Sequence, residues 1–194
     1  ILSVFIGGGT PSLFPAPVVA SLLQWVRENL NCPSDMEVTL EANPGAFDSD
    51  RFAGYRRAGV NRLSIGVQSF DSGSLRALGR IHDPQEAKSA AAAAGDCGFE
   101  NINLDLMFGL PGQRLPMTLD DIHTAIGLKP VHISFYQLTL EPNTPFYHAP
   151  PELPSEDDLW DMQQAGHSAL TEAGYRQYEV SAFAQAGRRC RHNL

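Results

Sequence analysis

Residues 101–112 read Asn-Ile-Asn-Leu-Asp-Leu-Met-Phe-Gly-Leu-Pro-Gly, a mainly apolar run that holds one acidic residue and ends in a Gly/Pro turn. Short aliphatic runs that end in glycine or proline are typical of buried β-strands. The segment before it, residues 83–95, opens with Asp-Pro and is rich in alanine, which favours a helix. A helix followed by a strand and a turn is the unit that builds a parallel sheet with outer helices.

The same alternation runs through the rest of the chain. Aliphatic and β-branched runs predict strands, and segments with helical period or capping residues predict helices between them. The predicted strands are residues 2–6, 37–41, 62–67, 102–107, 132–140 and 177–182. The predicted helices are residues 15–29, 48–58 and 83–95, and the capping pairs Thr118/Asp121 and Ser155/Asp158 predict two further helix starts. The sequence therefore predicts an α/β fold, a partial TIM-like (β/α)6 barrel with a parallel sheet and outer helices.

Length and composition limit what such a chain can be. With 194 residues it falls short of the roughly 250 residues of a complete eight-stranded barrel, so we expect one partial barrel domain over residues 1–194. The formal net charge of −8 and the absence of a long run of lysine and arginine argue against nucleic acid as a partner. The conspicuous apolar run, residues 90–94, is far shorter than the ~20 residues that cross a bilayer, so we expect no membrane span.

The cysteines and the first six residues give no catalytic or metal-binding motif. Cys32, Cys97 and Cys190 are odd in number and lack metal-ligand spacing, so we expect reduced thiols and no metal site in this chain. Residues 1–6 have no initiator Met and no basic flank. We therefore interpret them as a strand cut out of a longer protein and not as a signal peptide.

Several residues are interpreted as structural. In the helix over residues 15–29 the apolar residues Val18, Leu22, Leu23 and Val26 predict one buried stripe. Trp25 and Trp160 lie in helical patterns and are expected to pack in the core or between helices. The histidines show no ligand spacing: His82 is expected at the surface of a helix start, and the others are expected to be structural or exposed, namely His123, His132, His148 and His167.

Glycine and polar residues gather where the predicted strands end. The first strand is followed by Gly7-Gly8-Gly9-Thr10-Pro11-Ser12, and the second ends in Glu41. Gln68 follows the third strand, Arg80 comes on the next segment, and Asp105 lies within the fourth strand. The carboxyl ends of parallel strands meet at one edge of a sheet, where ligands bind. The sequence therefore predicts that these residues share one ligand site.

Each signal alone also has a purely structural interpretation. The glycines fit a tight strand-to-helix turn, Glu41 could cap a helix, and Gln68 and Arg80 could be surface residues. Asp105 is different, because a carboxylate in an apolar strand is costly without a partner. Taken together, the set suits a zwitterionic, ribose-bearing ligand whose carboxylate pairs with Arg80 and whose amino group and hydroxyls meet the carboxylates and the amide. No Gly-Lys-Ser/Thr follows the glycines, which excludes a P-loop.

Four stretches resemble the radical S-adenosylmethionine (SAM) proteins of the oxygen-independent coproporphyrinogen III oxidase family. They are residues 7–12, 41–45, 59–70 and 103–113. Further stretches are similar to the HemW-like branch of that family, heme chaperones long labelled as coproporphyrinogen oxidases. These are residues 78–82, 136–146 and 177–184, the last leading to residues 190–194. The resemblance covers essentially the whole chain.

The resemblance implies a set of cofactors and contacts. The SAM contacts of the family fall on the glycine turn and on four polar side chains, namely Gly8, Gly9, Thr10, Glu41, Gln68, Arg80 and Asp105. One or two SAM molecules are implied, with a [4Fe-4S] cluster that donates an electron to cleave the sulfonium bond. The family holds this cluster on a Cys-x3-Cys-x2-Cys loop before the first strand, and the HemW-like branch continues beyond His192-Asn193. We therefore expect the cluster ligands upstream of residue 1, a further domain after residue 194, and no activity from this chain alone.

The resemblance leaves three functions open. The first is the SAM-binding domain of a cytoplasmic HemW-like heme chaperone, with heme or porphyrin and a heme-acceptor protein as partners and His192 as a candidate heme ligand. The second is an oxygen-independent coproporphyrinogen III oxidase, which decarboxylates its substrate to protoporphyrinogen IX. The third is a β/α-barrel binding module without radical chemistry. No catalytic residue is assigned, and the sequence does not decide whether the chain is an enzyme.

Overall fold

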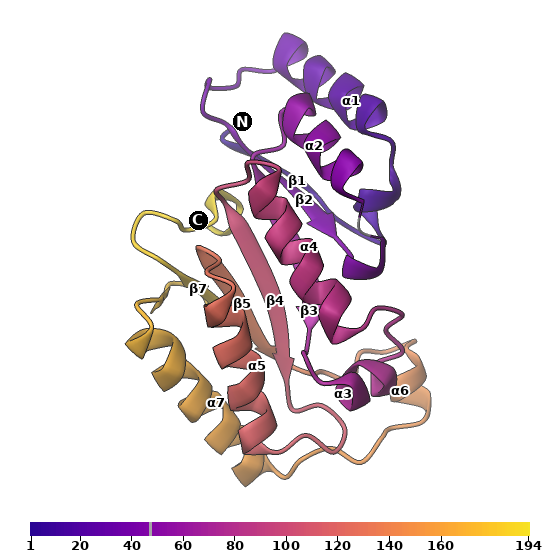
Figure 1. Cartoon of the computed structure of the whole chain (residues 1–194), viewed down its shortest axis with the longest axis vertical. Coiled ribbons are helices and arrows are strands. Elements are labelled where there is room, and N and C mark those ends of the chain that lie inside the picture. Colours follow the sequence, from indigo (N-terminus) through magenta and orange to yellow (C-terminus); the bar gives the residue numbers. More distant parts are fainter. Residues whose placement is uncertain (47) are drawn as a thin grey trace.

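A computed structural model of the chain describes residues 1–46 and 48–194, built around a seven-stranded sheet (Figure 1). The strand order is β1-β2-β3-β4-β5-β7-β6, and neighbours from β1 to β5 pair in parallel. The predicted α/β fold with a mostly parallel sheet is confirmed. The strands are β1 (Ser3–Ile6), β2 (Glu37–Ala42), β3 (Arg62–Gln68), β4 (Ile102–Phe108), β5 (His132–Gln137), β6 (Arg176–Gln177) and β7 (Ala182–Ala184).

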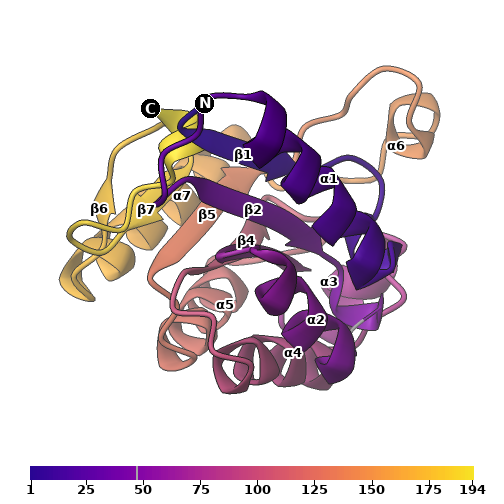
Figure 2. The same ribbon diagram turned by 90° about the horizontal axis from the view of Figure 1, so that it is seen from above.

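Helices cover the outer face of this sheet, as Figures 1 and 2 show for α2, α4, α5 and α7. The helices are α1 (Ala16–Asn29), α2 (Ser49–Ala58), α3 (Ser72–Ala77), α4 (Pro84–Asp96), α5 (Leu115–Gly127), α6 (Pro145–His148) and α7 (Glu156–Glu172). Short 3-10 turns lie at η1 (Pro11–Leu13), η2 (Pro44–Ala46) and η3 (Arg191–Asn193). Among the described residues, we find no helix with the length and apolar character that a membrane crossing requires.

The two faces of the sheet differ in chemistry because side chains alternate along each strand. On β3 the side chains of Leu63, Ile65 and Val67 are fully buried against the helices. Burial of each such side chain contributes about 1.5–3 kcal/mol, so the core lies between sheet and helices. The alternate residues face inward and are largely polar: Glu37, Thr39 and Glu41 on β2, Arg62, Ser64 and Gln68 on β3, Asn103 and Asp105 on β4, and His132, Ser134 and Tyr136 on β5.

Several predicted helix boundaries are confirmed by their capping contacts. Asp48 caps α2 by accepting a 2.9 Å hydrogen bond from the Asp50 N–H, and the helix stops at Gly59, which has a φ of 102°. Ser155 and Asp158 form the expected capping box of α7.

The predicted helix start at Thr118 is wrong. Helix α5 begins three residues earlier, after Arg114, and Thr118 is buried within it. The carboxylate of Asp121 does not cap this helix, because it accepts hydrogen bonds from Ser69 Oγ at 2.7 Å and from the Phe70 N–H at 2.6 Å. The Thr-x-x-Asp pattern suggests a helix cap, but Asp121 instead makes a tertiary contact between α5 and the loop after β3.

The predicted last strand, residues 177–182, is two short strands in the structure. A turn over residues 178–181 reverses the chain, so that β7 pairs antiparallel with β5 and β6 pairs antiparallel with β7. Gln177 Nε2 donates to the Val180 carbonyl at 2.9 Å and supports this turn. The chain then returns across the inner face, and η3 packs beside β1, with the His192 ring 4.9 Å from the Phe5 ring.

The expected buried stripe of α1 is only partly correct. Leu23 and Val26 are buried together with Val19, whereas Val18 and Leu22 are 52% and 47% exposed. The helix carries two adjacent apolar stripes, and the sheet covers the one that begins at Val19. The expected packing of the two tryptophans is also wrong, because Trp25 and Trp160 are 57% and 62% exposed.

Candidate functional site

A polar cavity of about 200 Å³ lies at the carboxyl edge of the parallel strands, and we call it the strand-end cavity. It brings together six of the seven predicted contacts, which are Gly9, Thr10, Glu41, Gln68, Arg80 and Asp105. Gly8, the seventh, adjoins it by donating its N–H to Glu41 Oε2 at 3.1 Å. The remaining lining residues are Pro11, Ala42, Asn43, Ser64, Gly66 and Tyr136.

The glycine turn after β1 and the Glu41 carboxylate form one wall. Gly8 and Gly9 have φ values of 86° and 63°, a left-handed conformation that side chains disfavour. This conformation turns the Gly8 N–H toward β2, where it donates to Glu41. Backbone groups and a carboxylate are therefore presented side by side.

Gln68 occupies the end of β3 in an unusual backbone conformation. Its φ is 68°, which costs a residue with a side chain roughly 1–2 kcal/mol. The pairing of β3 with β4 is irregular between Ile65 and Gln68. Its side chain is only 4% exposed, and Oε1 accepts a 2.7 Å hydrogen bond from the Tyr136 hydroxyl. The strained strand end thus directs an amide into the cavity, as expected where strain serves a site.

The Asp105 carboxylate accepts hydrogen bonds from two polar side chains on its own and the neighbouring strand. Asn103 Nδ2 donates to Oδ1 at 2.7 Å, and Ser64 Oγ donates to Oδ2 at 3.2 Å. Burial raises the pKa of the Asp105 carboxyl, while these hydrogen bonds and the charge of Arg62 lower it. The cost of placing a carboxylate in this strand is therefore met by dedicated partners, as the sequence predicts.

Arg80 lies where the strand-end cavity meets a second pocket. This pocket has a volume of about 530 Å³ and is lined largely by apolar residues, among them Leu78, Met107, Leu138 and Phe146. Arg80 is half-buried and lines both spaces. A ligand in either one can therefore meet the same guanidinium.

The remaining predicted residue, His192, lies elsewhere. It is exposed in η3, and its ring packs near Phe5 at the inner face. His82 is buried, not at the surface as expected, and its Nε2 lies 3.0 Å from the Val67 carbonyl oxygen. Burial lowers the pKa of His82. Neither histidine lines the strand-end cavity.

The polar lining residues that sequence reasoning missed include Tyr136 and Ser64. Both lie inside strands on the inward-facing side: Ser64 is opposite Glu41 in the pairing of β2 with β3, and the Tyr136 hydroxyl donates to Gln68. Burial and the charge of Asp105 raise the pKa of Tyr136, so its hydroxyl is a protonated donor at neutral pH. The signal that could have revealed Tyr136 is its alternation with His132 and Ser134, which makes one face of β5 polar.

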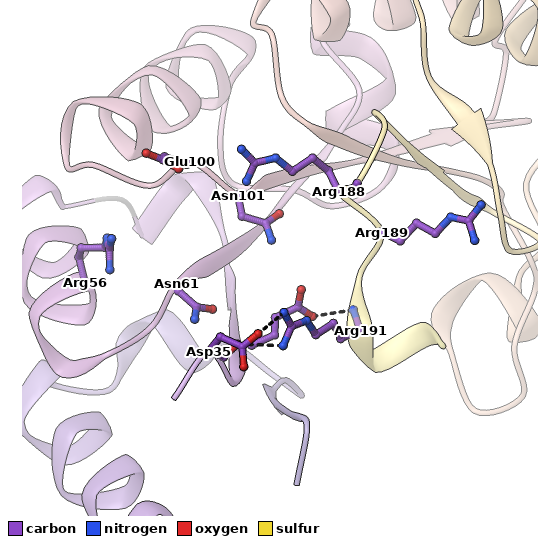
Figure 3. Close-up of a pocket in the computed structure, with 10 residues that line it drawn as sticks. Asp35, Arg56, Asn61, Glu100, Asn101, Arg188, Arg189 and Arg191 are labelled. Carbon is purple, nitrogen blue, oxygen red and sulfur yellow. Dashed lines mark hydrogen bonds and ion pairs between the residues drawn. The ribbon is translucent and has the colours of Figure 1, made fainter. Parts of the chain in front are cut away.

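A different polar pocket, of about 320 Å³, opens at the amino ends of β2, β3 and β4, on the opposite edge of the sheet (Figure 3). Its lining includes Asp35, Asn61 and Asn101, which lie just before these strands. Arg191 of the C-terminal segment pairs with Asp35 at 2.7 Å. This pocket contains none of the predicted cofactor contacts and is where the C-terminal segment docks.

The three cysteines do not converge. Cys190 is buried, whereas Cys32 and Cys97 are half-buried, and all three thiols are free. Over residues 1–46 and 48–194, no group of three or more Cys, His, Asp or Glu side chains is placed to hold a metal ion. The described residues thus offer no ligand set that fits an iron–sulfur cluster.

Comparison with curated proteins gives close relatives over the whole chain. The chain is 56% identical over 194 residues to the heme chaperone HemW of Escherichia coli (strain K12), covering 100% of this chain and 51% of that protein. It is 54% identical over 192 residues to the heme chaperone HemW of Haemophilus influenzae, covering 99% of this chain and 50% of that protein. The chain spans about half the length of the curated relatives it matches.

Comparison with solved structures agrees with this relationship. Coproporphyrinogen III oxidase (HemN) from Escherichia coli superposes with a TM-score of 0.86 at 27% sequence identity, over 96% of this chain and 44% of that one. The sequence profile of the radical SAM superfamily matches residues 1–124, which is more than half of the chain. The chain therefore belongs to the radical SAM superfamily.

Proposed function

We propose that this chain is the SAM-binding part of a HemW-like heme chaperone. The observation that carries the proposal is the strand-end cavity, where the ends of successive parallel strands gather two carboxylates, an amide and an arginine around a glycine turn. The relatives that are 56% and 54% identical bear the name heme chaperone. Membership of the superfamily implies SAM and a [4Fe-4S] cluster, and the cluster supplies the electron that cleaves the sulfonium bond of SAM.

The groups in the cavity fit the parts of SAM. Arg80 suits the carboxylate of the methionine moiety, because a guanidinium and a carboxylate pair through two parallel hydrogen bonds. Glu41 and the carbonyl groups of the glycine turn suit the amino group. Asp105 and Gln68 suit the ribose hydroxyls, which can donate to a carboxylate and accept from an amide. We assign no part of the cluster to the residues of this chain.

Heme or porphyrin is the ligand we propose for the second half of the function. The apolar pocket next to Arg80 offers a surface for a flat apolar ring, and Arg80 suits the carboxylates at its edge. His192, exposed in η3 and outside this pocket, is a separate candidate heme ligand in the proposal. As part of the same proposal, residues 1–194 form one partial barrel domain, and the protein works in the cytoplasm and passes heme to an acceptor protein.

The experiment that tests the cofactor site is SAM binding to the full-length, cluster-loaded protein, measured by calorimetry. Glu41→Ala and Asp105→Ala are each expected to weaken binding about tenfold or more, since each removes charge-assisted hydrogen bonds. Asp161→Ala, an exposed acidic residue on α7, is the control and should leave binding unchanged. Unchanged affinity in both cavity variants would remove the site assignment.

A second function is favoured by one observation, the TM-score of 0.86 with coproporphyrinogen III oxidase. In that case the cavity and its apolar neighbour would serve oxidative decarboxylation of coproporphyrinogen III. Mass spectrometry of the porphyrin after anaerobic incubation separates the two functions. Loss of propionate carboxyl groups supports the oxidase, whereas heme binding with an intact porphyrinogen supports the chaperone.

A further inference from the structure

A chain of buried hydrogen bonds runs from the strand-end cavity along the inner face of the sheet. Its central members, Asn103 and His132, are each 1% exposed. Asn103 Nδ2 donates to Asp105 Oδ1 at 2.7 Å and to Ser64 Oγ at 2.8 Å. Ser64 Oγ in turn donates to Asp105 Oδ2 at 3.2 Å. Both carboxylate oxygens of Asp105 are thus held by one connected pair of side chains.

The amide of Asn103 fixes which atoms donate to it. Its Oδ1 is a carbonyl oxygen and can only accept, and Ser134 Oγ donates to it at 3.1 Å. His132 Nδ1 lies 2.6 Å from the same oxygen and must therefore carry its hydrogen. Burial lowers the pKa of His132 to about 3, so the imidazole is neutral and Nε2 is bare at neutral pH. Nε2 then accepts from the Tyr178 hydroxyl at 2.7 Å.

The C-terminal segment contacts Tyr178, the last member of this chain of hydrogen bonds. The Tyr178 oxygen accepts a 3.0 Å hydrogen bond from the Cys190 N–H. The next residue, Arg191, donates its N–H to Glu37 Oε1 at 2.9 Å, and its guanidinium pairs with Asp35 at 2.7 Å, as Figure 3 shows. The hydrogen-bonded chain therefore joins the docked C-terminal segment at one edge of the sheet to Asp105 at the other.

We propose that Asn103 and His132 are positioning residues for the strand-end cavity: they hold the Asp105 carboxylate in one orientation, and Tyr178 supports His132 by donating to its Nε2. Neither Asn103 nor His132 lines the cavity, so both act through Asp105. The inference rests on the proposed function in one respect, the assignment of Asp105 to SAM.

The ionisation of Asp105 is set by the same neighbours. Burial raises its pKa, and the hydrogen bond from Asn103 is the first of the contacts that lower it. Loss of the Asn103 amide therefore shifts Asp105 toward the protonated form, which is a poorer partner for ligand hydroxyls and for an amino group. The charged or titratable groups that face Asp105 from neighbouring elements are Glu41, Arg62, Arg80, His132 and Tyr136.

The direct test is the carboxyl titration of Asp105, followed by 13C NMR in the full-length protein without added SAM. In Asn103→Leu the pKa of Asp105 is expected to rise by about one to two units, the size that loss of a hydrogen bond to a charged group gives. Ser64→Ala removes another donor and is expected to shift the pKa in the same direction, so the test stands even if Asn103→Leu does not fold. An unchanged pKa of Asp105 in a folded variant overturns the inference.

Tyr178→Phe tests the end of the hydrogen-bond chain that lies away from Asp105. The 15N signals of the His132 imidazole are expected to show hydrogen on Nδ1 in both proteins, because Asn103 Oδ1 still accepts from Nδ1 in the variant. The Nε2 signal is expected to shift in Tyr178→Phe, because Nε2 loses its donor. Tyr175→Phe is the control, since Tyr175 is a buried tyrosine that donates its hydroxyl to the Pro130 carbonyl at 2.6 Å, outside this chain of bonds. An unchanged Nε2 signal in Tyr178→Phe overturns the role of Tyr178.

SAM binding separates this inference from the proposed function. In the cluster-loaded protein, the pH at which Asn103→Leu loses SAM on acidification is expected to move upward together with the pKa of Asp105. A variant that is merely damaged would lose affinity equally at every pH, which would overturn the inference. A shifted carboxyl titration with an unchanged SAM profile would support the positioning chain and reject the assignment of Asp105 to SAM.

Discussion

The hydroxyl of Tyr136 donates a 2.7 Å hydrogen bond to Oε1 of Gln68, and this bond joins β5 to β3 across the intervening β4. Because Oε1 is engaged as an acceptor, Nε2 is the group that Gln68 can offer to a ligand. The raised pKa of Tyr136 keeps the phenol protonated at neutral and mildly alkaline pH. Gln68, which the sequence predicted as a site residue, is thus oriented by Tyr136, which the sequence did not predict.

Removal of that hydroxyl is expected to weaken SAM binding. Tyr136→Phe leaves the ring in place but frees the Gln68 amide, and loss of one neutral hydrogen bond corresponds to about a three- to tenfold higher Kd. Calorimetry on the full-length, cluster-loaded protein measures this change. Tyr147→Phe, on a tyrosine that is 52% exposed in α6, serves as the control. Equal Kd values for the two variants would contradict the orienting role of Tyr136.

The left-handed backbone of Gln68 gives a prediction about stability. Gln68→Gly and Gln68→Ala remove the same amide, but only glycine adopts the φ of 68° without strain. The glycine variant is expected to be more stable than the alanine variant by about 1 kcal/mol, measured by urea unfolding. If alanine were equally or more stable, the strand end would not hold this conformation in solution.

Asp121 is expected to make the free energy of unfolding fall as the pH rises from about 4 to 6. Its pKa is raised from 3.8 to about 6, chiefly because burial disfavours the charged form. Between about pH 4 and pH 6 the folded protein therefore keeps a proton that the unfolded chain has lost, and the free energy of unfolding falls as the pH rises through this window. A shift of two pKa units corresponds to about 3 kcal/mol.

Asp121→Asn is expected to remove this pH dependence. Relative to the parent protein, the variant should gain about 3 kcal/mol in free energy of unfolding between pH 4 and pH 7, measured by urea unfolding at intermediate steps. Asp120→Asn is the neighbouring control, because Asp120 is exposed and Asp121 is 4% exposed. A difference between parent and Asp121→Asn that stayed constant with pH would show that Asp121 is not buried as described.

The strand ends could be predicted because a physical rule places them together. Parallel strands in sequential order put their carboxyl ends on one edge, so Gly9, Glu41, Gln68 and Asp105 could be assigned to one cavity without any knowledge of long-range contacts. The helix starts at Asp48 and Ser155 were predictable for a similar reason, since a capping contact is local.

The other features depend on contacts that local sequence does not encode. The bond between His132 and Tyr178 joins residues 46 apart and depends on the turn that splits the predicted last strand. Asp121 matches a capping pattern, yet its carboxylate serves a loop that comes about 50 residues earlier in the chain. In α1 two apolar stripes compete, and only the packing on the sheet decides that Val19 is buried and Trp25 is not.

The position of His192 makes its proposed role in heme binding testable by a matched pair of variants. His192 is exposed on η3, with its ring near Phe5, and His123 is an exposed histidine on α5 that lines neither the strand-end cavity nor the apolar pocket. If His192 is a heme ligand, His192→Ala should lower heme affinity and shift the Soret band of the full-length protein, since the iron loses an imidazole. His123→Ala should leave both the titration curve and the spectrum unchanged. Identical hemin titrations for the two variants, followed by absorbance, would place the heme ligand elsewhere and leave the SAM cavity as the surviving part of the proposal.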